Sequence, residues 1–174
     1  MESTQKHILL TGSSGFVGQR FVEYNQERYV IHSVSLRTTK VNDIDWKKYD
    51  SIVHMAGKAH QMEKIDDQVY FDVNYELTKQ LADRAKREEV PHFVFVSTIK
   101  VWGDDYKNAH LKIETPCVPD DAYGKSKLQA ENYLQEIKTP DFKIAVVRPP
   151  LVYGPRVKGN MIRFMKLALS LIHI

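Results

Sequence analysis

Short apolar segments alternate with longer segments of helical periodicity along the chain. The apolar segments are His7–Leu10, Tyr29–Leu36, Ser51–Met55, His92–Ser97 and Lys143–Val147. The segments of helical periodicity begin near Gly15 and then cover Asp66–Glu88 and Ala122–Ile137. Continuous apolar runs indicate strands buried on both faces, and helices between them indicate parallel strands joined by crossovers. The pattern predicts an α/β fold built on a doubly wound parallel sheet.

Two segments depart from this alternation. The link from Arg37 to Asp50 is short and polar, so we expect at most a brief helix there instead of a full crossover helix. A last helix is expected from about Lys158, and it runs into the apolar residues Leu169–Ile174. Residues 169–174 resemble a translated sequencing adapter, which leaves a non-native tail and an ordinary apolar helix end as equal alternatives. Residues 1–168 are expected to form one domain.

Length and composition describe a single globular domain. The 174 residues are 43% hydrophobic and 27% charged, values that are ordinary for a globular protein with one core. The net charge of +3 is spread along the chain, so no nucleic-acid partner is expected. Cys117 is the one cysteine, which excludes an intrachain disulfide and a multi-cysteine metal cluster and indicates a reducing, cytoplasmic compartment. We expect no metal site, and no membrane association because no apolar run approaches about 20 residues.

A glycine-rich turn lies where the first expected strand ends and the first helix begins. Residues 11–18 read TGSSGFVG, with glycines at positions 12, 15 and 18. Glycine permits a tight turn and lets the backbone approach a pyrophosphate, while the helix N-terminus supplies free N–H groups. The placement predicts the dinucleotide-binding turn of a Rossmann domain. A purely structural glycine turn is the alternative, which the strand before it and the helix after it disfavour.

The second expected strand ends without the acidic residue that commonly binds the ribose 2′-OH of NAD. It ends at Ser35-Leu36-Arg37, and a guanidinium suits the geometry of a 2′-phosphate. Arg37 therefore favours NADP(H) modestly over NAD(H). A solvated arginine at the strand end is an equal alternative.

A tyrosine and a lysine lie four residues apart at the start of a predicted helix, as Tyr123 and Lys127. On one helix face, the ammonium and a cationic nicotinamide would both lower the tyrosine pKa from about 10, so that the phenol can move a proton. A hydroxyl at the end of the preceding strand, Ser97 or Thr98, can bind the substrate oxygen. We predict the catalytic set Thr98, Tyr123 and Lys127. A surface tyrosine and a threonine helix cap are the alternatives, which the glycine turn disfavours.

Five segments occur in the order typical of the extended short-chain dehydrogenase/reductase family. They are TGSSGFVG, His54–Gly57, FVFVSTIKVWG, Tyr123–Lys127 and RPPLVYGP. From Lys6 to about Lys166 the chain resembles this family, and in particular its NAD-dependent epimerase/dehydratase members. The resemblance implies that Thr98 binds the substrate oxygen, that Tyr123 is the acid/base, and that Lys127 activates Tyr123 and binds the ribose.

The resemblance also implies the cofactor and substrate contacts. The cofactor-binding residues would be Gly12, Gly15, Phe16, Val17 and Gly18 at the pyrophosphate, Ala56, Gly57 and Asn74 farther along, and Pro150 and Val152 beside the nicotinamide. Asn160 matches a position that contacts the substrate diphosphate in sugar-nucleotide members, which favours a nucleotide-sugar substrate. The C-terminal substrate-binding part of such enzymes is expected to be missing here, so the chain alone is not expected to be active. Members often dimerise through the helices that here carry Asn74 and Tyr123, so a homodimer is expected.

The residues that follow the predicted catalytic threonine help to choose among the reactions of this family. Dehydratase members have Asp-Glu after it, whereas this chain has Ile99-Lys100, which disfavours elimination of water. The phrases STIKVWG and RPPLVYGPRVKGN resemble bacterial surface-polysaccharide enzymes that reduce UDP-4-keto-6-deoxy-N-acetyl sugars, and Arg37 favours this reaction. A UDP-sugar 4-epimerase of the UDP-glucose/UDP-galactose type, with retained NAD, is the alternative. An NADP-binding redox sensor without turnover is the alternative of another class, disfavoured by the retained Tyr123 and Lys127.

Overall fold

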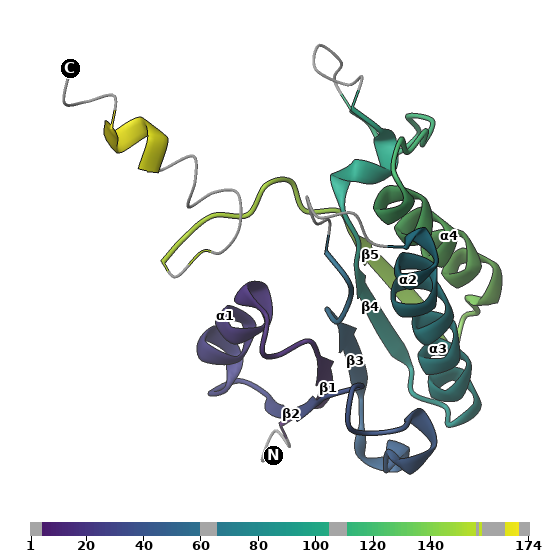
Figure 1. The fold of residues 1–174 in the computed structure, drawn as a ribbon. Coiled ribbons are helices and arrows are strands. Elements are labelled where there is room, and N and C mark those ends of the chain that lie inside the picture. Colours follow the sequence, from purple (N-terminus) through teal and green to yellow (C-terminus); the bar gives the residue numbers. More distant parts are fainter. Residues whose placement is uncertain (1–4, 60–65, 105–110, 156, 158–165, 171–174) are drawn as a thin grey trace.

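A five-stranded parallel sheet organises the chain (Figure 1). The structure is a computed structural model, and it describes residues 5–59, 66–104, 111–155, 157 and 166–170. The strands are β1 (His7–Thr11), β2 (Val30–Val34), β3 (Ser51–His54), β4 (His92–Val96) and β5 (Lys143–Val147). Their order is β2-β1-β3-β4-β5, which confirms the predicted doubly wound parallel sheet.

Helices cover both faces of the sheet. The crossover from β1 to β2 contains α1 (Phe16–Asn25), and the crossover from β4 to β5 contains α4 (Ala122–Ile137). Between β3 and β4 the predicted long helix is interrupted by a π-helical turn, so that it consists of α2 (Asp67–Phe71), η3 (Asp72–Glu76) and α3 (Leu77–Arg87). Figure 1 shows α1 on one side of the sheet and α2, α3 and α4 on the other.

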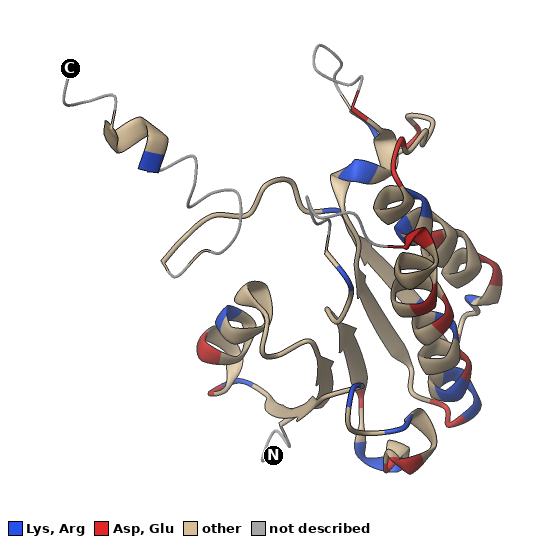
Figure 2. Ribbon diagram, viewed as in Figure 1, with Lys and Arg blue, Asp and Glu red and all other residues tan. Residues whose placement is uncertain are grey.

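Alternate residues of each central strand pack into two separate cores. In β1, Leu9 contributes to the larger core with α3 and α4, whereas Ile8 and Leu10 contribute to the smaller one with α1. This alternation follows from the two-residue period of a strand. Figure 2 places charged residues on helices and connections, and β1, β3 and β4 carry none. A sheet buried on both faces therefore accounts for the continuous apolar runs.

The link between β2 and β3 confirms the expectation of no full crossover helix. It contains the two short 3-10 turns η1 (Val41–Asp43) and η2 (Trp46–Lys48). The link is more buried than its polar composition predicts, because Ile44, Trp46 and Tyr49 join the larger core. A third 3-10 turn, η4 (Ile99–Trp102), follows β4.

The C-terminal segment is only partly described. Residues 166–170 are helical, within the helix expected from about Lys158. Residues 158–165 and 171–174 lie outside the described residues, so the division into a domain of residues 1–168 and a tail stays a prediction. Among the residues described, none of the helices combines the length and apolar character needed to cross a bilayer.

Candidate active site

The glycine turn packs so closely, against the segment after β3 at Gly12 and against the start of α1 at Gly18, that it needs glycine at both positions. Gly12 has φ 79°, and a Cβ there would lie 2.5 Å from the backbone nitrogen of Ala56. A Cβ at Gly18 would lie 2.2 Å from the carbonyl oxygen of Gly12. Both contacts are with backbone, which cannot move aside as a side chain can. The turn therefore brings the start of α1 directly against the ends of β1 and β3.

The N-terminus of α1 suits a phosphate group. Gly15 is the N-cap and has no side chain to bind the first N–H groups, and residues Phe16–Gln19 include no Asp or Glu. The first N–H groups of a helix lack partners within the helix, and the helix dipole adds partial positive charge there. The residues present therefore fit a dinucleotide pyrophosphate.

A cavity of about 300 Å³ opens beside this turn. It lies at the carboxyl ends of the strands, near the point between β1 and β3 where the strand order reverses, and this is where ligands of open α/β sheets bind. The glycine turn, the segment after β3, the end of β4 and α4 all contribute. The lining residues are Gly12, Gly15, Phe16, Val17, Gly18, Met55, Gly57, Lys58, Ala59, Val96, Ser97, Tyr123, Lys127 and Pro149.

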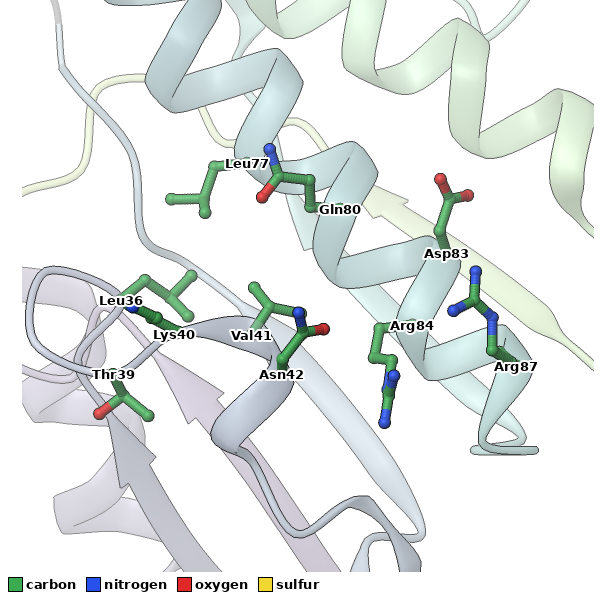
Figure 3. A pocket seen from close by; sticks show the side chains of 10 residues that line it. All are labelled: Leu36, Thr39, Lys40, Val41, Asn42, Leu77, Gln80, Asp83, Arg84 and Arg87. Carbon is green, nitrogen blue, oxygen red and sulfur yellow. The ribbon is translucent and has the colours of Figure 1, made fainter.

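A larger cavity of about 560 Å³ lies elsewhere, between the segment after β2 and α3 (Figure 3). Figure 3 shows Leu36 and Val41 on one side and Leu77 and Gln80 of α3 on the other. None of its lining residues belongs to the predicted site. The smaller cavity is the candidate site because it joins the glycine turn to Tyr123 and Lys127.

Tyr123 is held next to Thr98 by the start of α4. Asp121 caps α4 by accepting the Gly124 N–H at 2.6 Å, and a Cβ at Gly124 would lie 2.7 Å from the Lys100 carbonyl oxygen. This close approach places Tyr123 within hydrogen-bond reach of Thr98. The hydroxyl of Thr98 also caps η4 by accepting the Lys100 N–H at 3.2 Å. Thr98 is therefore both the cap and the partner of Tyr123, which were separate alternatives in the sequence.

Burial raises the pKa of Tyr123, and the hydrogen bond from Thr98 lowers it by less. The lowering of this pKa by Lys127 together with a bound cationic nicotinamide stays a prediction. Lys127 donates from Nζ to the Val96 carbonyl oxygen at 2.9 Å. Tyr123 is consequently a protonated phenol at neutral pH, which can donate a proton before it can accept one.

Lys127 is a buried cation beneath the cavity. Its Nζ lies 4.4 Å from the centre of the Phe95 ring, and burial lowers its pKa to about 8, while Glu131 acts in the opposite direction. A Cβ at Gly57 would lie 3.4 Å from this Nζ. Gly57 therefore leaves the space beside the ammonium open to the cavity.

Glu131, a buried residue one turn after Lys127, forms an ion pair with the partly buried Arg148 that the sequence did not predict. Arg148 donates from Nε to both carboxylate oxygens of Glu131, at 3.1 and 3.0 Å, and its guanidinium lies 4.6 Å from the Trp102 ring. The hydrogen bond to Glu131 raises the pKa of Arg148. The pair joins α4 to the segment after β5. The sequence signal was the four-residue spacing between Lys127 and Glu131 on one helix face.

Asn74, a predicted cofactor-binding residue, lies fully buried in the π-helical turn behind the cavity. Its Oδ1 accepts the Lys58 N–H at 2.8 Å, and its Nδ2 donates to the Lys58 carbonyl and to Ser126 Oγ, both at 3.1 Å. Asn74 thus binds the backbone of one lining residue and connects it to α4.

The other predicted site residues lie at different distances from the cavity. Arg37 is exposed after the end of β2 and is not in its lining. Ala56 donates its N–H to Thr11 Oγ1 at 3.3 Å, next to the lining residues Met55 and Gly57. Pro149 lines the cavity, whereas Pro150 and Val152 are exposed beyond it. Asn160 lies outside the described residues.

Ser97 has a feature that the sequence could not indicate. It is 4% exposed and lines the cavity, and its Oγ has no hydrogen-bond partner among the described residues. Buried hydroxyl groups are nearly always hydrogen-bonded. The Oγ of Ser97 is therefore a candidate ligand contact at the cavity, in addition to Thr98. The lining residues Met55, Lys58, Ala59, Val96 and Pro149 were also missed, although each is next to or within two residues of a predicted one.

Comparisons with known proteins agree with this geometry. A UDP-glucose 4-epimerase from Vibrio cholerae is 33% identical over 185 residues, which cover 93% of this chain and 56% of that protein. The UDP-glucuronic acid 4-epimerase of Bacillus cereus, solved with NAD, superposes with a TM-score of 0.77 at 23% identity, covering 94% of this chain and 63% of that one. The dTDP-4-dehydrorhamnose reductase of Bacillus anthracis, solved with NADP, gives 0.79 at 20% identity, covering 98% and 62%.

These likenesses differ in what they show. The two solved structures are less than 25% identical to this chain and show the fold alone. The chain spans about half the length of the curated relatives it matches. Residues 8–173 match the NAD dependent epimerase/dehydratase family, which is almost the entire chain. The chain therefore belongs to the NAD dependent epimerase/dehydratase family.

Proposed function

We propose that this chain is the cofactor-binding part of an NAD(P)-dependent enzyme that oxidises and reduces one hydroxyl-bearing carbon of a nucleotide sugar. The observation that carries the proposal is the hydrogen bond between Thr98 and the protonated Tyr123, next to a cavity that contains the glycine turn and Lys127. A phenol and a second hydroxyl at one point suit the binding of a single sugar oxygen.

Proton transfer at that oxygen is the part of the reaction assigned to this chain. When bound, a nicotinamide cofactor supplies the acceptor or donor of hydride. Oxidation of a hydroxyl group removes a hydride from carbon and a proton from oxygen. Tyr123 takes that proton as phenolate, or returns it as phenol in the reduction, while Thr98 holds the same oxygen. The positive charge of the Lys127 ammonium, one turn along α4, favours the phenolate form.

A UDP-sugar 4-epimerase is the activity that the relatives favour. The Vibrio cholerae relative is a UDP-glucose 4-epimerase at 33% identity. An epimerase oxidises the sugar and then reduces it from the opposite face, so the same Tyr123 serves both half-reactions. Ile99 and Lys100 stand after Thr98 where dehydratases need an acid and a base, so elimination of water is not proposed.

Reduction of a UDP-4-keto-6-deoxy-N-acetyl sugar for surface polysaccharide synthesis is the second candidate. One observation favours it: Arg37, and no acidic residue, follows β2, where NADP-dependent enzymes bind the 2′-phosphate. The cytoplasmic location and the homodimer stay predictions, as does the contact between Asn160 and the substrate diphosphate.

The two activities are separated by their use of cofactor. We expect the complete protein that carries this chain to interconvert UDP-glucose and UDP-galactose, or their N-acetyl forms, without added cofactor. Tyr123→Phe is expected to reduce turnover by at least about 1,000-fold while cofactor binding is retained, because it removes only the proton-transferring oxygen. NADPH oxidation with a 4-keto-6-deoxy sugar, and no epimerisation, would establish the reductase instead. Cofactor binding without turnover of any sugar nucleotide would indicate the redox sensor.

A further inference from the structure

The buried histidine at the end of β3 connects β1 to α3. His54 is 0% exposed and takes no part in the proton transfer proposed for Tyr123. Its Nδ1 lies 2.6 Å from Thr11 Oγ1, and its Nε2 lies 2.9 Å from Thr78 Oγ1. The ring stacks on Phe95 with centroids 5.8 Å apart. Both ring nitrogens are therefore hydrogen-bonded away from solvent.

The neighbouring bonds determine which nitrogen carries the hydrogen. Thr78 Oγ1 donates its one hydrogen to the carbonyl oxygen of Asn74 at 2.7 Å. It can then only accept from His54, so Nε2 must be the protonated nitrogen. A neutral imidazole has one N–H, which leaves Nδ1 as an acceptor for the Thr11 hydroxyl.

Thr11 in turn accepts the Ala56 N–H at 3.3 Å. All hydrogens then point the same way, from Ala56 through Thr11, His54 and Thr78 to the carbonyl of Asn74. We call these five residues the His54 relay. Every donor and acceptor atom of the relay has a partner, and such fully satisfied buried networks are rigid.

The surroundings of His54 favour the neutral imidazole. Burial lowers the pKa of His54 to about 3, and the Lys127 ammonium acts in the same direction. The other groups around the ring, Thr11 from β1, Thr78 from α3 and Phe95 from β4, carry no charge. A second ring proton would face the Thr11 hydroxyl and reverse its hydrogen bond.

The two ends of the His54 relay hold the same segment, residues 56–58, which lies at the cavity. Ala56 adjoins Gly57, and its nitrogen is the atom that a side chain at Gly12 would strike. At the other end, the Asn74 side chain binds both the N–H and the carbonyl of Lys58. Residues 56–58 are thus held from two sides, and the His54 side chain links the two attachments.

We propose that His54 is a positioning residue, which as the Nε2–H tautomer orients the hydroxyl groups of Thr11 and Thr78 and thereby holds residues 56–58 at the cofactor cavity. The second half of this proposal rests on the proposed function, because it takes the cavity to hold the cofactor. The tautomer itself does not depend on any ligand.

The tautomer is tested by long-range ¹H–¹⁵N spectra of the complete protein labelled at its histidine ring nitrogens, without cofactor. The His54 signals are identified by their loss in His54→Gln. We expect Nδ1 to resonate as an unprotonated nitrogen and Nε2 as a protonated one, unchanged between pH 6 and 8. A protonated Nδ1, or a ring that titrates in that interval, overturns the proposal.

The positioning role is tested by Thr78→Val, which keeps the shape of the side chain and removes the acceptor for His54. Thr78→Val removes the hydrogen bonds of Thr78 Oγ1 to both His54 and the Asn74 carbonyl oxygen. Binding of NADH and NADPH, followed by fluorescence, is expected to weaken about tenfold as residues 56–58 lose this support. Turnover at saturating cofactor and substrate is expected to stay within about twofold. Thr139→Val is the matched control, because Thr139 Oγ1 accepts the Phe142 N–H at the opposite end of the sheet.

The two outcomes that contradict the proposals are distinguishable. Unchanged cofactor affinity in a folded Thr78→Val protein would overturn the positioning role while leaving the proposed function intact. A wild-type protein that binds neither NADH nor NADPH would overturn the proposed function, and the nitrogen spectra would still decide the tautomer.

Discussion

At the scale of single residues, Ser97 and Thr98 are neighbours at the end of β4 with different surroundings. Thr98 Oγ1 accepts the Lys100 N–H and hydrogen-bonds Tyr123, whereas Ser97 Oγ lines the cavity without a partner among the residues described. The sequence left both as candidates for one role. In the proposed function Thr98 shares the substrate oxygen, because it hydrogen-bonds the phenol of Tyr123. Ser97 is placed to contact whatever fills the cavity beside it.

Substitution of the two hydroxyl residues should therefore have separate effects. In the complete protein, we expect Thr98→Val to lower kcat by about 100-fold with little change in cofactor affinity. Ser97→Ala should instead weaken cofactor binding by about three- to tenfold and leave kcat within about twofold. Steady-state kinetics and cofactor titration check this, with Thr98→Ser as the conservative control. The reverse pattern would exchange the two roles.

Lys127 gives a second prediction at this scale, through pH. Its pKa falls from 10.5 to about 8 on folding, so between pH 8 and 10.5 the unfolded chain binds more protons than the folded one. Stability from this residue therefore rises with pH in that interval, and the full cost of the buried charge, about 3 kcal/mol, is present below pH 8. We expect Lys127→Met to stabilise the complete protein most near pH 7 and progressively less toward pH 10. Denaturant unfolding at several pH values measures this, and a pH-independent difference would contradict it.

At the scale of secondary-structure elements, the site depends on close contacts between element ends. The start of α1 needs Gly18, the start of α4 needs Gly124, and the π-helical turn η3 turns Asn74 toward Lys58. The insertion of one residue that makes a π turn is common at functional sites. Periodicity predicted a continuous helix over Asp66–Glu88, because one additional residue hardly changes its hydrophobic pattern.

The ion pair of Glu131 with Arg148 should stabilise the arrangement of α4 and the segment after β5. Glu131→Gln leaves a partly buried guanidinium without its carboxylate, and we expect a loss of about 3 kcal/mol in the free energy of unfolding. The pKa of Lys127 should fall further, because Glu131 is the group that opposes its desolvation. Thermal unfolding and the pH dependence of turnover measure both effects. The double variant Glu131→Gln/Arg148→Met is the control, and it should recover part of the stability because no unpaired charge remains.

At the scale of the whole molecule, the strand order creates the site. The order β2-β1-β3-β4-β5 puts the glycine turn, Gly57 and Ser97 at adjacent carboxyl ends of β1, β3 and β4. Residues separated by nearly two thirds of the chain, Gly12 and Tyr123 among them, line one cavity as a result. The chain spans about half the length of the curated relatives it matches.

The sequence by itself determined the strands, the parallel sheet, the glycine turn and the approximate places of Thr98, Tyr123 and Lys127. These follow from local causes, namely hydrophobic periodicity and the backbone freedom of glycine. Tertiary structure alone decided the raised pKa of Tyr123, the unpaired hydroxyl of Ser97, the Glu131–Arg148 pair and the direction of the His54 relay. The reason is that desolvation and hydrogen-bond partners come from residues distant in the chain, such as Val96 with Lys127 and Thr11 with His54, which only folding brings together.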